Sequence, residues 1–175
     1  MKKEPLLDLN EAVQHPGRRM VFNFETALED DEELDLVTPV VGHIEAVSTG
    51  SQLLLESSFC TKCCLECARC GSPLEIALEF DMSDNFEVEG IPSSYASDSY
   101  AKVLTDEPTP LFKHNALYRD TYVRQGVWVN LPTQPLCEFG WDGDCPHAAA
   151  LHSKDKPAGH PAFRSLEGIH LEDAE

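Results

Sequence analysis

The clearest pattern in the chain is an alternation of apolar and polar residues from Gln52 to Glu66. Successive side chains of a strand point to opposite faces, so a strand here has one face suited to the core. That face carries Leu53, Leu55, Ser57, Phe59, Thr61, Cys63 and Leu65. A second alternating segment, Pro73–Phe80, follows the short sequence Cys67-Ala68-Arg69-Cys70-Gly71. The two segments predict a β-hairpin with a cysteine pair at its turn.

Weaker patterns surround this hairpin. Leu36–Ser48 is alternating and β-branched, and Thr49-Gly50-Ser51 is typical of a hairpin connection. Leu117–Asn130 is the best candidate for a helix, although Gly126 weakens it by about 1 kcal/mol relative to alanine. The pattern predicts an α+β fold, with a mostly antiparallel sheet, a central cysteine-bearing hairpin and one or two packing helices.

The length of 175 residues favours one domain. We expect this domain to span residues 1–165 and to be followed by an acidic, frayed tail at 166–175. Two acidic stretches, at about 25–35 and 81–110, are expected to form mobile loops, because the first is rich in carboxylates and the second also in serine and proline.

The net charge of the chain restricts the class of macromolecule that it can bind. The net charge is −18, and the 13 basic residues are scattered along the chain. Binding to a phosphate backbone needs clustered lysine and arginine. The acidic runs are therefore read either as solvated surface or as a face for a basic partner, such as a ribosomal protein. Direct contact with RNA stays open.

The sequence also bears on localisation and catalysis. No apolar run approaches the roughly 20 residues that span a bilayer, and the charged start, Met1–Pro5, does not resemble a signal peptide. We expect a cytoplasmic protein. No nucleophile motif and no glycine-rich phosphate loop is present, which predicts a protein that is not an enzyme and has no small-molecule substrate.

The seven cysteines carry the strongest chemical signal. In the cytosol thiols stay reduced, so metal binding is a better explanation for them than disulfides. Cys67 and Cys70 have the two-residue spacing with which one turn presents two thiolates to a metal, and Cys137 and Cys145 form the candidate second pair. These four residues are the predicted ligands of a structural zinc ion. His147 and His152 are alternative ligands.

Five cysteines lie within residues 60–70, which leaves other assignments open. Cys63 falls on the apolar face and is expected in the core. Cys60 and Cys64 fall on the opposite face, but the spacing of Cys64, Cys67 and Cys70 is also similar to that of bacterial ferredoxins. The alternative function is therefore an iron–sulfur or thiol redox protein that uses the cluster from Cys60 to Cys70.

Several segments are similar to the YceD-like family of bacterial proteins. The sequence Leu65-Glu66-Cys67-Ala68-Arg69-Cys70-Gly71-Ser72-Pro73-Leu74 resembles the Cys-x-Arg-Cys hairpin of that family. Downstream, Arg124–Pro132 resembles its helix ending in Leu-Pro, and Pro135-Leu136-Cys137 its Pro-x-Cys. The segment Pro161–Leu166 is similar to the closing segment. In this order the matches extend from about residue 6 to about residue 170.

The resemblance implies a non-catalytic role in the accumulation of large-subunit ribosomal RNA and in ribosome biogenesis. Its implied partner is a ribosomal protein or a pre-ribosomal particle. It also implies a zinc site built from a Cys-x2-Cys pair and downstream cysteines. The chain departs from the family in the spacing of Cys137 and Cys145 and in its additional cysteines, Cys60, Cys63 and Cys64.

Overall fold

The computed structural model describes residues 5–28, 34–94, 100–104 and 111–149. These residues divide into two compact units. The first comprises the described parts of Met1–Leu65 and Glu75–Thr133, and the second those of Glu66–Leu74 and Gln134–Glu175. Each unit is considered separately.

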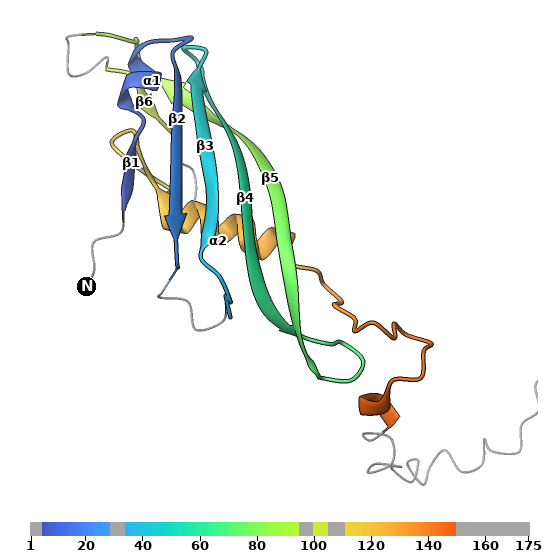
Figure 1. Cartoon of the computed structure of the whole chain (residues 1–175). Coiled ribbons are helices and arrows are strands. Elements are labelled where there is room, and N and C mark those ends of the chain that lie inside the picture. The colour runs from blue at the N-terminus through green and yellow to red at the C-terminus, as the bar shows by residue number, and fades with distance from the viewer. Residues whose placement is uncertain (1–4, 29–33, 95–99, 105–110, 150–175) are drawn as a thin grey trace, which may run out of the picture. The chain divides into compact units, whose positions relative to one another are not determined.

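The first unit is built on a five-stranded sheet in the order β2-β3-β4-β5-β6 (Figure 1). Its strands are β2 (Arg19–Thr26), β3 (Val40–Ser48), β4 (Gln52–Glu66), β5 (Pro73–Glu89) and β6 (Lys102–Val103). The pairs β2–β3, β3–β4 and β5–β6 are antiparallel. A second, three-stranded antiparallel sheet has the order β1-β8-β7, with β1 (Leu6–Asp8), β7 (Phe112–Lys113) and β8 (Ala116–Tyr118).

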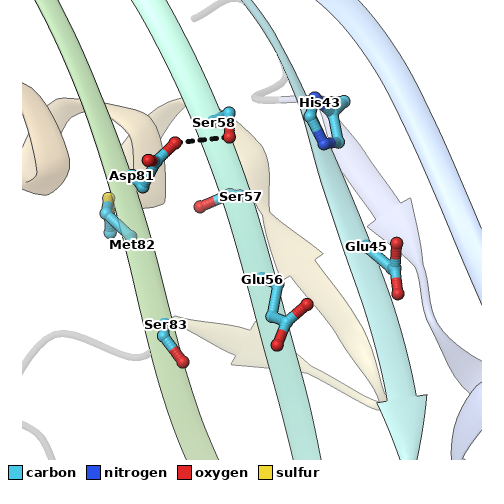
Figure 2. A pocket seen from close by; sticks show the side chains of 8 residues that line it. All are labelled: His43, Glu45, Glu56, Ser57, Ser58, Asp81, Met82 and Ser83. Carbon is cyan, nitrogen blue, oxygen red and sulfur yellow. Dashed lines mark hydrogen bonds between the residues drawn. The ribbon is translucent and has the colours of Figure 1, made fainter.

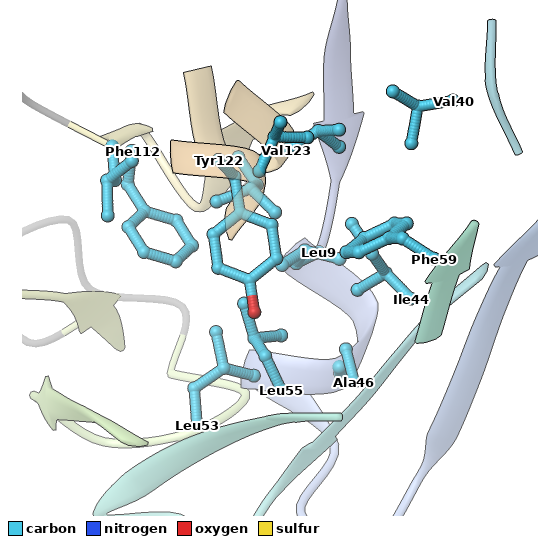
Figure 3. Close-up of a cluster of buried hydrophobic side chains, with 14 of the residues drawn as sticks. Leu9, Val40, Ile44, Ala46, Leu53, Leu55, Phe59, Phe112, Tyr122 and Val123 are labelled. Atoms are coloured by element: carbon cyan, nitrogen blue, oxygen red, sulfur yellow. The ribbon is translucent and has the colours of Figure 1, made fainter. Parts of the chain in front are cut away.

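The large sheet buries one face because its strands alternate. On β4 the inward side chains Leu53, Leu55 and Phe59 are at most 3% exposed. Phe59 joins three strands: its ring centroid lies 5.9 Å from that of Phe24 and 5.4 Å from that of Phe80. Figure 3 shows Leu53, Leu55 and Phe59 packed with side chains of other elements around Tyr122. Burial of this apolar face is the main stabilising contribution to the unit.

Helix α2 (Arg119–Asn130) packs on this buried face, and the short helix α1 (Asn10–Gln14) contributes Ala12 and Val13 to the same core. The hydroxyl of Tyr122 donates to Asp84 at 2.7 Å and lies 3.4 Å from the hydroxyl of Ser57. Burial, together with the nearby Asp84 carboxylate, raises the pKa of Tyr122, so it stays a neutral donor.

The α+β prediction with mostly antiparallel sheets is confirmed. The hairpin prediction is also confirmed, with β4 at the centre of its sheet. The connection at residues 49–51 forms as expected: Thr49 N–H donates to the carbonyl of Gln52 at 2.9 Å, and Gly50 takes a φ of +101°.

Three boundary predictions were wrong. The start of the predicted loop 81–110 continues β5 to Glu89, because Met82, Phe86 and Val88 keep facing the core while Asp81, Glu87 and Glu89 face outward. Likewise, Glu25 and Thr26, at the start of the predicted loop 25–35, belong to β2. The described helix begins at Arg119 instead of Leu117, because residues 116–118 pair with β1. The predicted tail, 166–175, lies outside the described residues.

Candidate metal centre

The second unit contains the turn that joins β4 to β5. This turn spans residues 67–72 and is closed by Cys67 N–H, which donates to the carbonyl of Ser72 at 2.9 Å, and by Gly71 N–H, which donates to that of Cys67 at 2.9 Å. Gly71 has a φ of +66°, a left-handed conformation that glycine adopts without strain. The turn therefore brings Cys67 and Cys70 together locally, as their spacing predicts.

Residues 134–149 supply the other side of the unit. Ala68 N–H donates to the carbonyl of Pro135 at 2.8 Å, and Cys137 N–H donates to the sulfur of Cys67 at 3.4 Å. At the end of this segment, residues 146–149 form one helical turn that starts directly after Cys145. These contacts bring the downstream cysteines to the hairpin turn.

The guanidinium of Arg69 anchors the loop between the downstream cysteines. Its Nη1 donates to the carbonyl of Gly140 at 2.9 Å and to that of Gly143 at 2.7 Å. A planar guanidinium suits such paired acceptors. The sequence interpretation gave Arg69 no role of its own, although its place inside the Cys-x-Arg-Cys motif was the available signal.

Three of the four predicted ligands form a group that is positioned to hold a metal ion. The sulfur atoms of Cys67, Cys70 and Cys137 all lie within 4.8 Å of one another. The fourth residue, Cys145, is 2% exposed, and its sulfur lies 4.0 Å from that of Cys137. In tetrahedral zinc sites with Zn–S bonds of about 2.3 Å, neighbouring sulfurs are about 3.8 Å apart. All seven cysteines are free thiols.

The thiols differ in how readily they ionise. Burial opposes ionisation of Cys67, but N–H groups of Cys70, Arg69 and Cys137 donate to its sulfur and lower its pKa to about 6. The N–H of Ala148, in the helical turn, likewise lowers the pKa of Cys145 although burial opposes it.

Cys137 behaves in the opposite way. The N–H of Phe139 favours its thiolate, but burial and the other thiols of the cluster outweigh this contact and raise the pKa of Cys137 to about 11. Adjacent thiols cannot all carry a negative charge without a cation between them. The ionisation of Cys67 and Cys145 is therefore already favoured, whereas the Cys137 thiol would have to lose its proton when a metal ion binds.

The remaining cysteines lie outside this group of three. Cys63 is buried, as expected, and burial raises its pKa. Cys60 is exposed and Cys64 is half-buried. The side chain of His147 is exposed, while its backbone N–H donates to Cys145. His152 lies outside the described residues.

Comparisons with known proteins give no relative. No protein-family model matches the chain, and no curated protein or solved structure shows significant similarity to it. Within the described part of the chain, no helix has the length and hydrophobicity to cross a membrane.

Proposed function

We propose that Cys67, Cys70, Cys137 and Cys145 bind one structural zinc ion. The observation that carries the proposal is the meeting of thiols from two segments about 70 residues apart, at separations close to those of a tetrahedral site. Four thiolates would leave no open coordination position, which is typical of structural zinc and not of catalytic zinc.

The second unit also needs such a stabiliser. Its apolar cluster consists of Cys67, Cys70, Cys145 and Ala148, with Leu74, Leu136 and Cys137 packed against it. A core this small contributes little hydrophobic free energy, so a metal supplies the missing stabilisation.

We propose further that the chain is a non-catalytic factor in ribosome biogenesis, working in the cytoplasm on a ribosomal protein or a pre-ribosomal particle. The resemblance to the YceD-like family supports a role in ribosome biogenesis. The negative charge of the chain supports contact with a basic protein. With a net charge of −18, approach to an RNA backbone is repelled, whereas approach to a basic protein is attracted.

The exposed face of the large sheet supplies an acidic surface for this contact. Its outward side chains include the acids Glu25, Glu45, Glu56, Glu79, Asp81, Glu87 and Glu89. Among the described strands of this sheet, the outward cations from β2 to β5 are Arg19, which pairs with Glu45, and Lys62. Figure 2 shows part of this face, where Asp81 accepts a hydrogen bond from Ser58 and Glu56 lies across from Glu45.

The decisive experiment is co-sedimentation of the full chain with ribosomal particles at low and at physiological salt. We expect the wild-type chain to travel with large-subunit precursors and to dissociate as salt rises, because attraction between exposed charges is screened. Depleting the chain from cells should also lower the amount of large-subunit ribosomal RNA. A chain that stays at the top of the gradient at every salt concentration overturns the ribosomal assignment.

Metal analysis and visible absorbance of the same purified protein distinguish a zinc site from an iron–sulfur cluster. Metal analysis of reduced protein should give one zinc per chain and no iron. Brown protein with visible absorbance after anaerobic purification would instead establish an iron–sulfur cluster.

A further inference from the structure

One long edge of the large sheet lacks a neighbouring strand. β4 lies on one side of β5, and β6 pairs with β5 on the other side only at Val88 and Glu89. From Asn85 back toward Glu75, no strand in the described residues continues along this edge (Figure 1). An unpaired edge presents a row of N–H and C=O groups that can pair with another chain.

The hydrogen bonds of β5 identify the groups on that edge. Val88 N–H donates toward β4, to the carbonyl of Ser51 at 2.9 Å, whereas the carbonyl of Glu87 accepts from Leu104 N–H at 2.8 Å on the opposite side. Backbone groups of successive residues in an antiparallel strand point to opposite sides. Exposure alternates without a break along β5, so no bulge interrupts this phase. The groups of Ser83, Asp81 and Glu79 therefore point to the open edge.

The two faces beside this edge differ in chemistry. Outward-facing positions 75, 79, 81, 87 and 89 are acidic, and no lysine or arginine occurs among the outward positions of β5. On the opposite face, β5 and α2 enclose a groove of about 380 Å³ that is lined by the apolar Met82, Phe86 and Val129 together with the polar Asp84 and Gln125. Val129 is 82% exposed at its rim. Asp81 and Ser83 also line the groove, so it reaches the open edge of β5.

We infer that the edge of β5 binds an extended segment of a basic protein as an added strand. Alternate side chains of such a strand point to opposite faces. One set, lysine or arginine, lies over the acidic row, and the other set, apolar, enters the groove between β5 and α2. Backbone hydrogen bonds supply affinity in this mode, and the flanking side chains supply specificity.

Charge argues for a basic partner over a second copy of this chain. Pairing two β5 edges would place the acidic rows of both copies side by side, which is repulsive. The edge of β5 would be the surface that contacts the ribosomal partner, so the inference rests on the proposed function. Binding of a peptide to this edge can nevertheless be measured independently of any ribosomal particle.

The probe is a fluorescent peptide of about ten residues that alternates lysine and valine, long enough to cover the open edge. We expect the full chain to bind it, with fluorescence anisotropy as the readout. A block peptide, with all its lysines first and its valines after them, has the same charge and composition. It should bind at least about tenfold more weakly, because it cannot place lysine on one face and valine on the other.

Two charge-reversal variants localise the contact. Glu79→Lys/Glu87→Lys replaces two acids in the acidic row of β5. Glu45→Lys/Glu56→Lys alters the net charge by the same amount, but on β3 and β4 of the same face. We expect the first variant to weaken binding at least about tenfold and the second less than about threefold, because close charge pairs dominate over screened distant ones. Equal losses would show diffuse electrostatic attraction and overturn the edge site.

Proline tests the backbone pairing directly. Ser83→Pro removes one edge N–H and is tolerated on an edge strand, while Ser83→Ala keeps the N–H. We expect Ser83→Pro alone to weaken binding at least about tenfold, with circular dichroism confirming that both variants are folded. Unchanged binding by a folded Ser83→Pro protein overturns the inference, and so does absence of binding by the wild type.

The same variant separates this inference from the proposed function. If the peptide binds with these variant effects but no ribosomal particle does, the ribosomal proposal fails and the docking site stands. If particles bind Ser83→Pro and wild type equally, the docking site fails and the ribosomal proposal stands.

Discussion

The thiol of Cys67 accepts hydrogen bonds from the N–H groups of Arg69 and Cys70 in the hairpin turn and from that of Cys137 in the downstream segment, which is why its thiolate is favoured. We expect Cys67→Ser to lower zinc from one ion per chain to near zero, because an alcohol is a poor zinc ligand in a thiolate site. Metal analysis of reduced protein gives the stoichiometry. Cys60→Ser is the matched control: Cys60 is exposed and outside the cysteine cluster, so it should leave zinc unchanged. Full occupancy in a Cys67→Ser/Cys70→Ser double variant would show that the ligands lie elsewhere.

Zinc binding at this site should depend on pH through the same thiols. Metal binds thiolates, so protons compete with it. The pKa of Cys67 is lowered to about 6 and that of Cys137 is raised to about 11. Apparent zinc affinity should therefore fall as pH falls, and most steeply below about pH 6, where Cys67 also takes up a proton. Chelator competition measures this affinity, and equal values at about pH 5.5 and about pH 7.5 would contradict it.

Cys63 illustrates a different use of a thiol. It is 1% exposed on the inner face of β4, and its sulfur lies 3.8 Å from the carbonyl oxygen of Ile76. Cys63→Ala should lower the free energy of unfolding by about 1 kcal/mol, the cost of a small cavity. Cys60→Ala on the exposed face should have almost no effect. Denaturant unfolding compares them, and loss of zinc in Cys63→Ala would assign this thiol to the metal centre instead.

At the scale of elements, the contact between α2 and β5 depends on Gly126. A Cβ atom at this position would lie 2.2 Å from the sulfur of Met82 and 2.9 Å from the ring of Phe80. Alanine gains about 1 kcal/mol of helix propensity, but the forced displacement of two packed side chains costs about 1 to 3 kcal/mol. Gly126→Ala should therefore be neutral to destabilising in denaturant unfolding, never stabilising by the full propensity difference.

A double variant separates propensity from packing at this contact. If the clash with Met82 is the cost, Met82→Ala should destabilise the Gly126→Ala background less than it destabilises the wild type. Additive effects of the two substitutions would rule out the clash as the cause.

The two units of the molecule should respond differently to loss of metal. The first unit has a large continuous core, whereas the second has a small cluster built mostly around cysteines. Chelation should expose residues 134–149 to protease while far-ultraviolet circular dichroism retains the signal of the large sheet, since structural zinc contributes directly to folding free energy. The Cys67→Ser variant should be cleaved in the same segment without chelator. A uniform loss of all structure on chelation would show that the units fold as one.

The sequence by itself determined the elements whose pattern is local. The alternation from Gln52 to Glu66 predicted both the strand and its buried face, including Cys63, because side-chain direction in a strand follows from position alone. The spacing of Cys67 and Cys70 also predicted that they meet, because two intervening residues place both thiols on one turn of the backbone.

Only the tertiary structure decided what depends on distant contacts. The acids of residues 81–89 indicated a loop, yet these residues form a strand, because Phe86 packs against Phe112 at 4.8 Å between ring centroids. Gly126 counted as a weakness of the helix, yet it leaves room for the side chain of Met82, which a Cβ atom at this position would displace. The position of Cys137 beside Cys67 depends on backbone contacts between segments about 70 residues apart, which no local spacing can specify.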